Sequence, residues 1–253
     1  MKSAINPEPR LEALLRRRGA WFDGAGLCMD QARRRSEATR LIAESFPSFE
    51  IFRRRISEHD LAAPSSPNFK HILSALINAA VLNIDDGRIA PTSADARRYL
   101  SGGWLEEYAG LAIEAAGAHE TRIGQRLGWM AKGFKGVNEV DAIARFDRAI
   151  IFVSAKALRP RLEDGDDQHR ERLMEALQEA DNLVDHFGEP NSAVFLLVTT
   201  GLFDRRREWV RYEQLHGKAA ALGVELIGLE DIGWTSLVQR FSIFANRNAK
   251  ASR

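Results

Sequence analysis

The chain of 253 residues has a single cysteine, and it also lacks a long apolar run. The lone Cys28 cannot form an internal disulfide or a cysteine-built zinc site, and such sparse use of cysteine is typical of a reducing compartment. The longest uninterrupted apolar stretch is Ala193–Val198, far shorter than the ~18 residues that span a bilayer, and the N-terminus has no apolar signal core. We therefore expect a cytoplasmic protein with no membrane partner, in which any metal is held by oxygen atoms or histidines.

An excess of one charge is also missing, because 36 Lys and Arg oppose 35 Asp and Glu. A net charge of +1 gives no general attraction to nucleic acid, so a polyanion site would have to be a local patch. Arginine does cluster, and solvated helix faces are the simpler interpretation of that clustering. The four arginine triplets are Arg16–Arg18, Arg33–Arg35, Arg53–Arg55 and Arg205–Arg207.

The hydrophobic content of 45% and charged content of 28% are typical of a globular protein. Apolar residues recur at helical spacing between Glu12 and Ile56, which predicts a helical segment over residues 1–63. Ala62–Pro67 has the composition of a linker. After it, a helical pattern, an Asp-Asp-Gly turn and a brief strand at Arg88–Ala90 predict a winged-helix-like region over residues 68–100.

The rest of the chain, residues 101–253, alternates between the two periodicities. Strands in mid-chain that lead into an alternating α/β tail predict an α/β fold with one mixed sheet flanked by helices. The expected helices are Trp104–Ala116, Asp167–Phe187, Arg205–Leu222 and Gly233–Ala245, and the expected strands are Thr121–Met130, Val137–Arg145, Ala149–Leu158, Val194–Thr199 and Val224–Leu229.

The second and third of these strands form a predicted hairpin with a two-residue loop at 147–148. In that register Asp141 stands opposite Ser154, and Glu139 stands opposite Lys156. Because side chains alternate along a strand, all four project from one face. Charges near the centre of a sheet are costly unless each is paired or bound to a cation.

Two carboxylates beside a lysine suit a divalent metal, since Mg²⁺ accepts one or two carboxylates together with waters and phosphate oxygens. A metal-activated water and a neighbouring ammonium are the parts that hydrolytic phosphoryl transfer needs. The alternative is an internal salt bridge between the two acids and Lys156, and spacing alone does not separate the two interpretations.

Two stretches of sequence resemble a known superfamily. Asn138–Asp141 followed by Ile151–Lys156 resembles the strand pair of the PD-(D/E)XK nucleases. Tyr99–Tyr108, which contains Gly-Gly-Trp-Leu-Glu, resembles the entry helix of CRISPR-associated nucleases that cyclic oligoadenylate activates. The similarity extends over about Phe69–Ile232 and implies a restriction-endonuclease-like sheet and a metal-dependent endonuclease.

The resemblance implies roles for particular residues. Asp141 would bind the metal, Lys156 would be the catalytic lysine, and Glu106 an accessory acid that also binds the metal. Ser154 stands where the superfamily has its second acid, so another carboxylate must substitute or the site is degenerate. Glu106 is the preferred substitute, Glu139 is a further metal ligand, and weaker candidates near the site are Ser154, Glu107 and Gln178.

The resemblance also implies partners. The cofactor would be Mg²⁺ or Mn²⁺, the substrate DNA or RNA, and Arg159 and Arg161 would contact its backbone. A homodimer and a role in CRISPR-type antiviral defence follow by the same resemblance. Only 68 residues precede Phe69, too few for the family's sensor domain, so we do not expect cyclic oligoadenylate to bind directly. The alternative function is a catalytically degenerate scaffold that binds nucleic acid or a protein.

Overall fold

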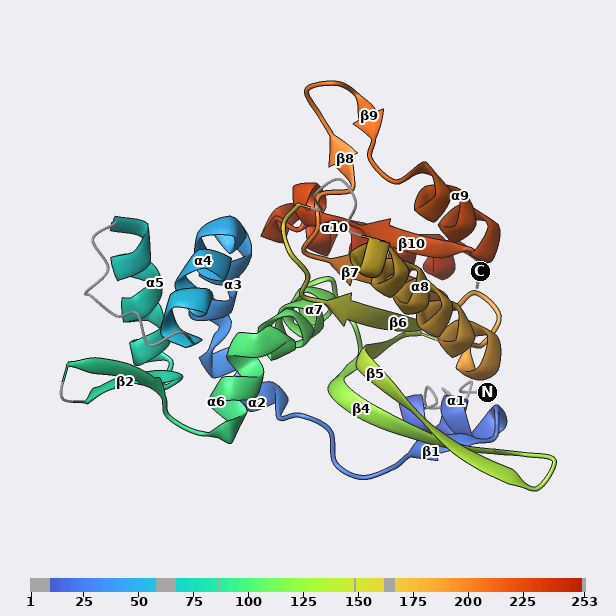
Figure 1. Cartoon of the computed structure of the whole chain (residues 1–253). Helices are drawn as coiled ribbons and strands as arrows, with labels where there is room; N and C mark the ends of the chain where they lie inside the picture. Colours follow the sequence, from blue (N-terminus) through green and yellow to red (C-terminus); the bar gives the residue numbers. More distant parts are fainter. Residues whose placement is uncertain (1–9, 58–66, 86, 148, 162–166, 252–253) are drawn as a thin grey trace.

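A mixed six-stranded sheet flanked by helices forms the body of the protein (Figure 1). The computed structural model describes residues 10–57, 67–85, 87–147, 149–161 and 167–251. The sheet has the order β1-β4-β5-β6-β7-β10, antiparallel from β1 to β6 and parallel from β6 to β10. Its strands are β1 (Ala20–Phe22), β4 (Glu120–Ala131), β5 (Phe134–Phe146), β6 (Ala149–Lys156), β7 (Ala193–Val198) and β10 (Val224–Ile227). The α/β architecture expected from the sequence is confirmed.

Helices cover both faces of this sheet. One apolar cluster joins a sheet face to α7 and α10, and a second joins the opposite face to α1, α8 and α9. In the described part of the chain no helix has the length and apolarity to cross a bilayer. The α-helices are α1 (Leu11–Arg17), α2 (Met29–Arg34), α3 (Ser36–Glu44), α4 (Phe46–Ser57), α5 (Pro67–Asn78), α6 (Ala94–Arg98), α7 (Trp104–Ala115), α8 (Asp167–Phe187), α9 (Glu213–Leu222) and α10 (Trp234–Ala251), with a π-helical turn at Tyr99–Gly103 and a 3-10 turn at Leu229–Asp231.

Strand β6 is the centre of the sheet. Ile150 and Phe152 pack into one cluster, whereas Ile151 and Val153 pack into the other, so the strand is apolar on both faces. This burial explains why a continuous apolar run forms a strand here.

The N-terminal segment is not only helical, because it also supplies the edge strand β1. Ala20 pairs with Trp129 of β4 in the antiparallel direction, and the leucines of α1 are buried beneath the sheet. Helices α2, α3 and α4 follow, as the periodicity predicts. Most of the predicted linker at 62–67 lies outside the described residues, and the boundaries between the three predicted regions stay predictions.

The winged-helix-like region consists of α5 and a hairpin of β2 (Leu82–Asp85) and β3 (Arg88–Pro91). The sequence indicated only the second of these strands. Ser93 caps the next helix, α6, since its hydroxyl accepts a hydrogen bond from the amide of Ala96 at 3.1 Å.

One predicted helix is partly wrong. Residues 205–212 of the expected helix Arg205–Leu222 belong instead to a hairpin of β8 (Phe203–Asp204) and β9 (Trp209–Val210) and to its connection to α9. The Asp204 carboxylate accepts hydrogen bonds from the amides of Arg206 and Arg207, which closes a turn in place of a helix.

Candidate metal-dependent active site

The site lies where β5 and β6 separate. The predicted register is confirmed from Phe146↔Ala149 to Ala142↔Val153, where the ladder stops. Beyond that point Asp141 Oδ2 accepts a hydrogen bond from the backbone amide of Ala155 at 2.6 Å. A carboxylate thus replaces the missing carbonyl acceptor, and the gap between the two strands holds polar side chains. Arg148 of the predicted turn lies outside the described residues.

These side chains line one cavity of about 330 Å³ between the strands and α8. The four residues that the register places on one face all contribute to it. The lining residues are Val137, Asn138, Glu139, Asp141, Ser154, Lys156, Glu179 and Leu183.

Asp141 and Lys156 both line the cavity, and their charges interact. Burial raises the pKa of Asp141, although Lys156 and the Ala155 amide oppose the shift. Burial alone would lower the pKa of Lys156, but the carboxylates of Asp141 and Glu179 outweigh it and raise that pKa. Lys156 therefore stays a cation, and its Nζ lies 3.3 Å from Glu179 Oε2.

Glu106, in the first turn of α7, approaches Asp141 from outside the cavity lining. Burial and the nearby Asp141 charge raise the pKa of Glu106 to about 7. Its Oε1 accepts a hydrogen bond from Arg98 Nη1 at 3.2 Å, which leaves its charge only partly compensated. Glu106 is largely buried, because only 20% of its side chain is accessible.

Two glycines lie near Glu106. Gly124 has a left-handed backbone, and a Cβ there would lie 2.4 Å from Leu27 Cγ, whereas Glu106 Oε2 would be in ordinary contact at 3.4 Å. A Cβ at Gly103 would lie 2.5 Å from the Arg98 guanidinium that holds Glu106. The Gly-Gly-Trp-Leu-Glu motif therefore has a direct structural use.

Glu107 has a different partner from Glu106. Its Oε1 accepts a hydrogen bond from the buried Arg35 at 3.1 Å, which ties α7 to the N-terminal helices. Arg35 also pairs with Asp95 at 2.7 Å. Glu107 does not line the cavity, so the structure gives it a packing role.

On α8 the structure puts Glu179 at the cavity where the sequence suggested Gln178. Gln178 is exposed and does not line the cavity, whereas Glu179 lines it and pairs with Lys156. The helical period could have indicated Glu179, because this residue lies three positions after the buried Ala176 and four positions before the buried Leu183. Arg98, the partner of Glu106, had no comparable signal.

The donor set suits one small divalent cation. Asp141 and Glu106 are two largely buried carboxylates with raised pKa values, and Mg²⁺ or Mn²⁺ takes one or two carboxylates plus waters. Glu139 is exposed, and Ser154 is buried with only a hydroxyl to offer. Over the described ranges no group of three or more His, Cys, Asp and Glu converges as a cage, so water and substrate oxygens would complete the coordination.

Arg159 and Arg161 lie beyond the end of β6 and outside this cavity. They line a separate cavity of about 710 Å³ together with Arg54 and Arg211, and Glu50 and Glu230 line it too. Guanidinium groups in such a cavity can bind phosphates.

Comparisons with known proteins identify the fold. No protein-family model matches the chain, and no curated protein matches it. The structure resembles VC1899 from Vibrio cholerae (TM-score 0.66, 16% identity, 94% of this chain and 62% of that chain). It also resembles Can2 from Sulfobacillus thermosulfidooxidans, solved in complex with cyclic tetra-adenylate (TM-score 0.58, 11% identity, 93% of this chain and 61% of that chain). The chain thus shares their fold and spans about three fifths of their length.

Proposed function

We propose that the protein is a metal-dependent nuclease that hydrolyses phosphodiester bonds of DNA or RNA. The observation that carries the proposal is the meeting of Asp141 and Lys156 in one cavity, with the buried carboxyl of Glu106 beside them. The shared fold with Can2 and the sequence resemblance to CRISPR-associated nucleases support a role in antiviral defence.

In this proposal Asp141 and Glu106 hold Mg²⁺ or Mn²⁺. Glu139, which lines the same cavity as Asp141, assists them. Bound there, the ion would supply a more acidic water and a Lewis acid for a phosphoryl oxygen. The Ala155 amide orients Asp141, and the Arg98 guanidinium orients Glu106. Both hydrogen bonds hold carboxylate oxygens in place before substrate arrives.

Lys156 supplies the protein's own stabilisation of charge. Its ammonium is kept protonated by Asp141 and Glu179, so it can donate to the phosphate oxygens as negative charge develops. Arg159 and Arg161 bind the backbone phosphates on either side of the scissile bond.

Two substitutions test the assignment. Asp141→Asn and Lys156→Ala should each reduce Mn²⁺-dependent cleavage of labelled DNA and RNA by at least about 100-fold. Glu175→Gln, on the exposed face of α8, is the matched control and should cleave like the wild type. Undiminished cleavage by either variant, with circular dichroism showing a native fold, would refute the proposal.

The second candidate is a degenerate scaffold, and Ser154 favours it. A buried hydroxyl at that position is a much weaker metal ligand than a carboxylate. A scaffold should show no Mn²⁺ binding in calorimetry and should keep nucleic-acid binding in Asp141→Asn. Measurable Mn²⁺ binding that Asp141→Asn abolishes would exclude the scaffold.

A further inference from the structure

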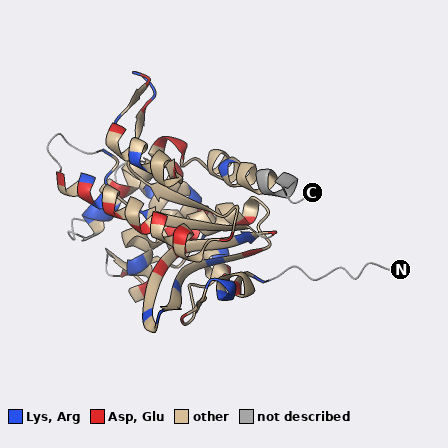
Figure 2. Cartoon of the chain, turned by 90° about the vertical axis from the view of Figure 1, so that its right-hand side faces the viewer, with Lys and Arg blue, Asp and Glu red and all other residues tan. Residues whose placement is uncertain are grey.

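The β8–β9 hairpin projects from the body of the protein (Figure 1). Its strands have two residues each. Figure 2 colours parts of the ribbon of this projection blue for Lys and Arg and red for Asp and Glu. Arg205 through Trp209 are all exposed there, and Glu208 has a left-handed backbone with φ of 50°.

The hairpin rises from the same edge of the sheet as the candidate active site. Strands β6 and β7 are parallel, and Lys156 pairs with Val198 at their shared carboxyl end. The segments that follow stay together, because the Leu158 amide donates to Thr199 Oγ1 at 2.7 Å and the Gly201 amide donates to Pro160 O at 3.0 Å. The base of the hairpin therefore lies beside Arg159.

One side of the hairpin is strongly basic. A cavity of about 570 Å³ there has five arginines and a single carboxylate, Asp204, which pairs with Arg211 at 2.9 Å. Arg205 pairs with Asp231 at 2.9 Å, but among the described residues no ion pair involves Arg206 or Arg207. The cavity is lined by Arg161, Phe203, Asp204, Arg205, Arg206, Arg207 and Arg211. Arg206 and Arg207 are both exposed, and although the Arg207 charge helps to lower the pKa of Asp204, five arginines against one carboxylate leave an excess of positive charge that suits a polyanion.

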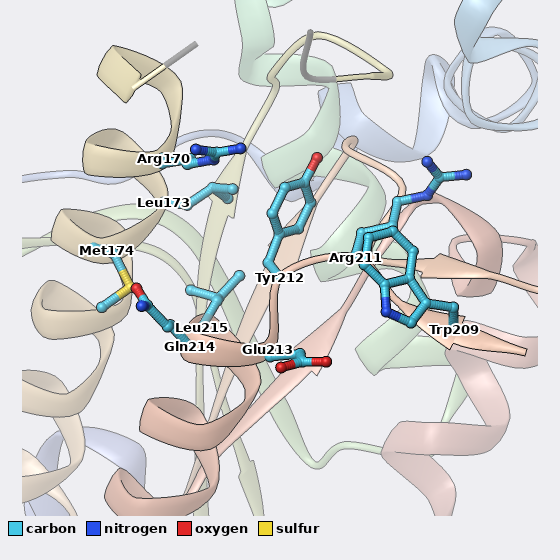
Figure 3. A pocket seen from close by; sticks show the side chains of 9 residues that line it. All are labelled: Arg170, Leu173, Met174, Trp209, Arg211, Tyr212, Glu213, Gln214 and Leu215. Atoms are coloured by element: carbon cyan, nitrogen blue, oxygen red, sulfur yellow. The ribbon is translucent and has the colours of Figure 1, made fainter. Parts of the chain in front are cut away.

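The other side of the hairpin carries an aromatic pocket of about 410 Å³ (Figure 3). Trp209 is 47% exposed, and within the described chain it makes no contact with another ring or with a guanidinium. Leu173, Met174 and Leu215 form an apolar floor, and Figure 3 shows Arg170 across the pocket from Trp209. Pockets of this size accept nucleotide-sized ligands.

Arg211 lines both cavities, so the basic side and the aromatic pocket are continuous through one residue. Single-stranded nucleic acid needs this combination, because its phosphates bind cations while its unpaired bases stack on aromatic rings. A duplex keeps its bases stacked inside and offers no face to Trp209. An acidic protein would explain the arginines but not an aromatic pocket of nucleotide size.

We propose that the β8–β9 hairpin binds a single-stranded nucleic acid, with Arg206 and Arg207 on its phosphates and one unpaired base against Trp209. The inference deepens the proposed function, because it names single strands as the substrate class held at this edge of the sheet. Stacking and charge are the only interactions required, so DNA and RNA are both ligands of this surface.

Binding of labelled oligo(dT) and oligo(rU) in EDTA tests the hairpin without any cleavage. Trp209→Ala should weaken both affinities about tenfold, and Trp209→Phe should restore most of the loss, because a smaller ring still stacks. Arg206→Ala combined with Arg207→Ala should reduce the slope of log affinity against log salt by about 1.4. A duplex of the same length should bind Trp209→Ala as well as it binds the wild type.

Matched controls come from the chain itself. Phe134→Ala removes a 75% exposed aromatic residue from the β4–β5 hairpin, and Arg16→Ala with Arg17→Ala neutralises an exposed pair in another arginine triplet. Neither should change affinity by more than about twofold. The inference fails if the wild type binds neither oligonucleotide, or if Trp209→Ala leaves both affinities intact or weakens the duplex equally.

The two proposals fail separately. Oligonucleotide binding that depends on Trp209, with no metal-dependent cleavage by the wild type, would support the hairpin and refute the nuclease. Cleavage that depends on Asp141 but is unchanged in Trp209→Ala would support the nuclease and refute the role of the hairpin.

Discussion

Burial decides the chemistry of individual carboxyl groups in this protein. Glu106 and Glu107 are neighbours on one helix, yet one faces Asp141 and the other faces Arg35. The two side chains leave α7 in different directions, so a pair of adjacent acids divides between a candidate active site and an ion pair. The pH dependence of the protein's stability tests each of these two carboxyl groups separately.

Glu106 should make stability depend on pH. Its pKa rises from an ordinary value of 4.5 to about 7, so its contribution is fully present below about pH 4.5 and is lost as pH rises through 7. Without metal, Glu106→Gln should therefore be more stable than the wild type at pH 8 by about 2–3 kcal/mol, and nearly equal to it at pH 5. Urea denaturation in EDTA at the two pH values measures this, with Glu171→Gln as an exposed control. An equal effect at both pH values would contradict the burial argument.

Adding a carboxylate at Ser154 tests the candidate metal site by supplying one more metal ligand. Ser154→Asp adds a carboxylate to the cavity that Asp141 and Lys156 share, and Mn²⁺ affinity should rise about tenfold because hard cations bind oxygen anions best. Calorimetric titration compares the variant with Ser154→Asn, which has similar size and no charge. Unchanged affinity in the aspartate variant would show that this position does not face the ion.

At the scale of elements, a buried ion-pair group connects α7 to the N-terminal helices. Arg35 is 5% exposed and contacts both Glu107 and Asp95, and Thr39 bonds to Tyr99 at 2.9 Å in the same region. The position of α7, and with it of Glu106, therefore depends on helices distant in sequence.

Arg35→Met should destabilise the fold by about 3–5 kcal/mol, because it leaves Glu107 buried without its partner. The loss should be larger at pH 8 than at pH 5, since burial raises the pKa of Glu107 and protonation relieves the unpaired charge. Arg34→Met, its exposed neighbour, should stay within about 0.5 kcal/mol of the wild type in urea denaturation. A comparable loss of stability in Arg35→Met and Arg34→Met would contradict a stabilising role for the Arg35–Glu107 ion pair.

At the scale of the whole molecule, the N-terminal segment is part of the main sheet. Strand β1 covers the edge of β4, and Leu11, Leu14 and Leu15 of α1 are fully buried. An open β4 edge would present unpaired amide and carbonyl groups to other chains.

Deletion of residues 1–22 should therefore give a poorly soluble protein with a much lower denaturation midpoint. The three buried leucines alone contribute on the order of 5–9 kcal/mol of apolar burial. Soluble yield and urea midpoints compare this deletion with the full chain. Equal midpoints for the two proteins would show that the segment is dispensable.

The sequence by itself determined five strands of the main sheet, β4, β5, β6, β7 and β10, and the candidate pair. Alternation with period two and a short hairpin loop specify register, so Asp141 and Lys156 could be placed together before any tertiary contact was known. The expected roles of the site residues stay predictions until activity is measured.

Only the tertiary structure decided which other groups reach these two. Burial of Glu106, the exclusion of Gln178 in favour of Glu179, and the exposed ring of Trp209 all depend on contacts between segments far apart in the chain. Local periodicity carries no information on such contacts, because the burial and pKa of a side chain are set by whatever packs against it.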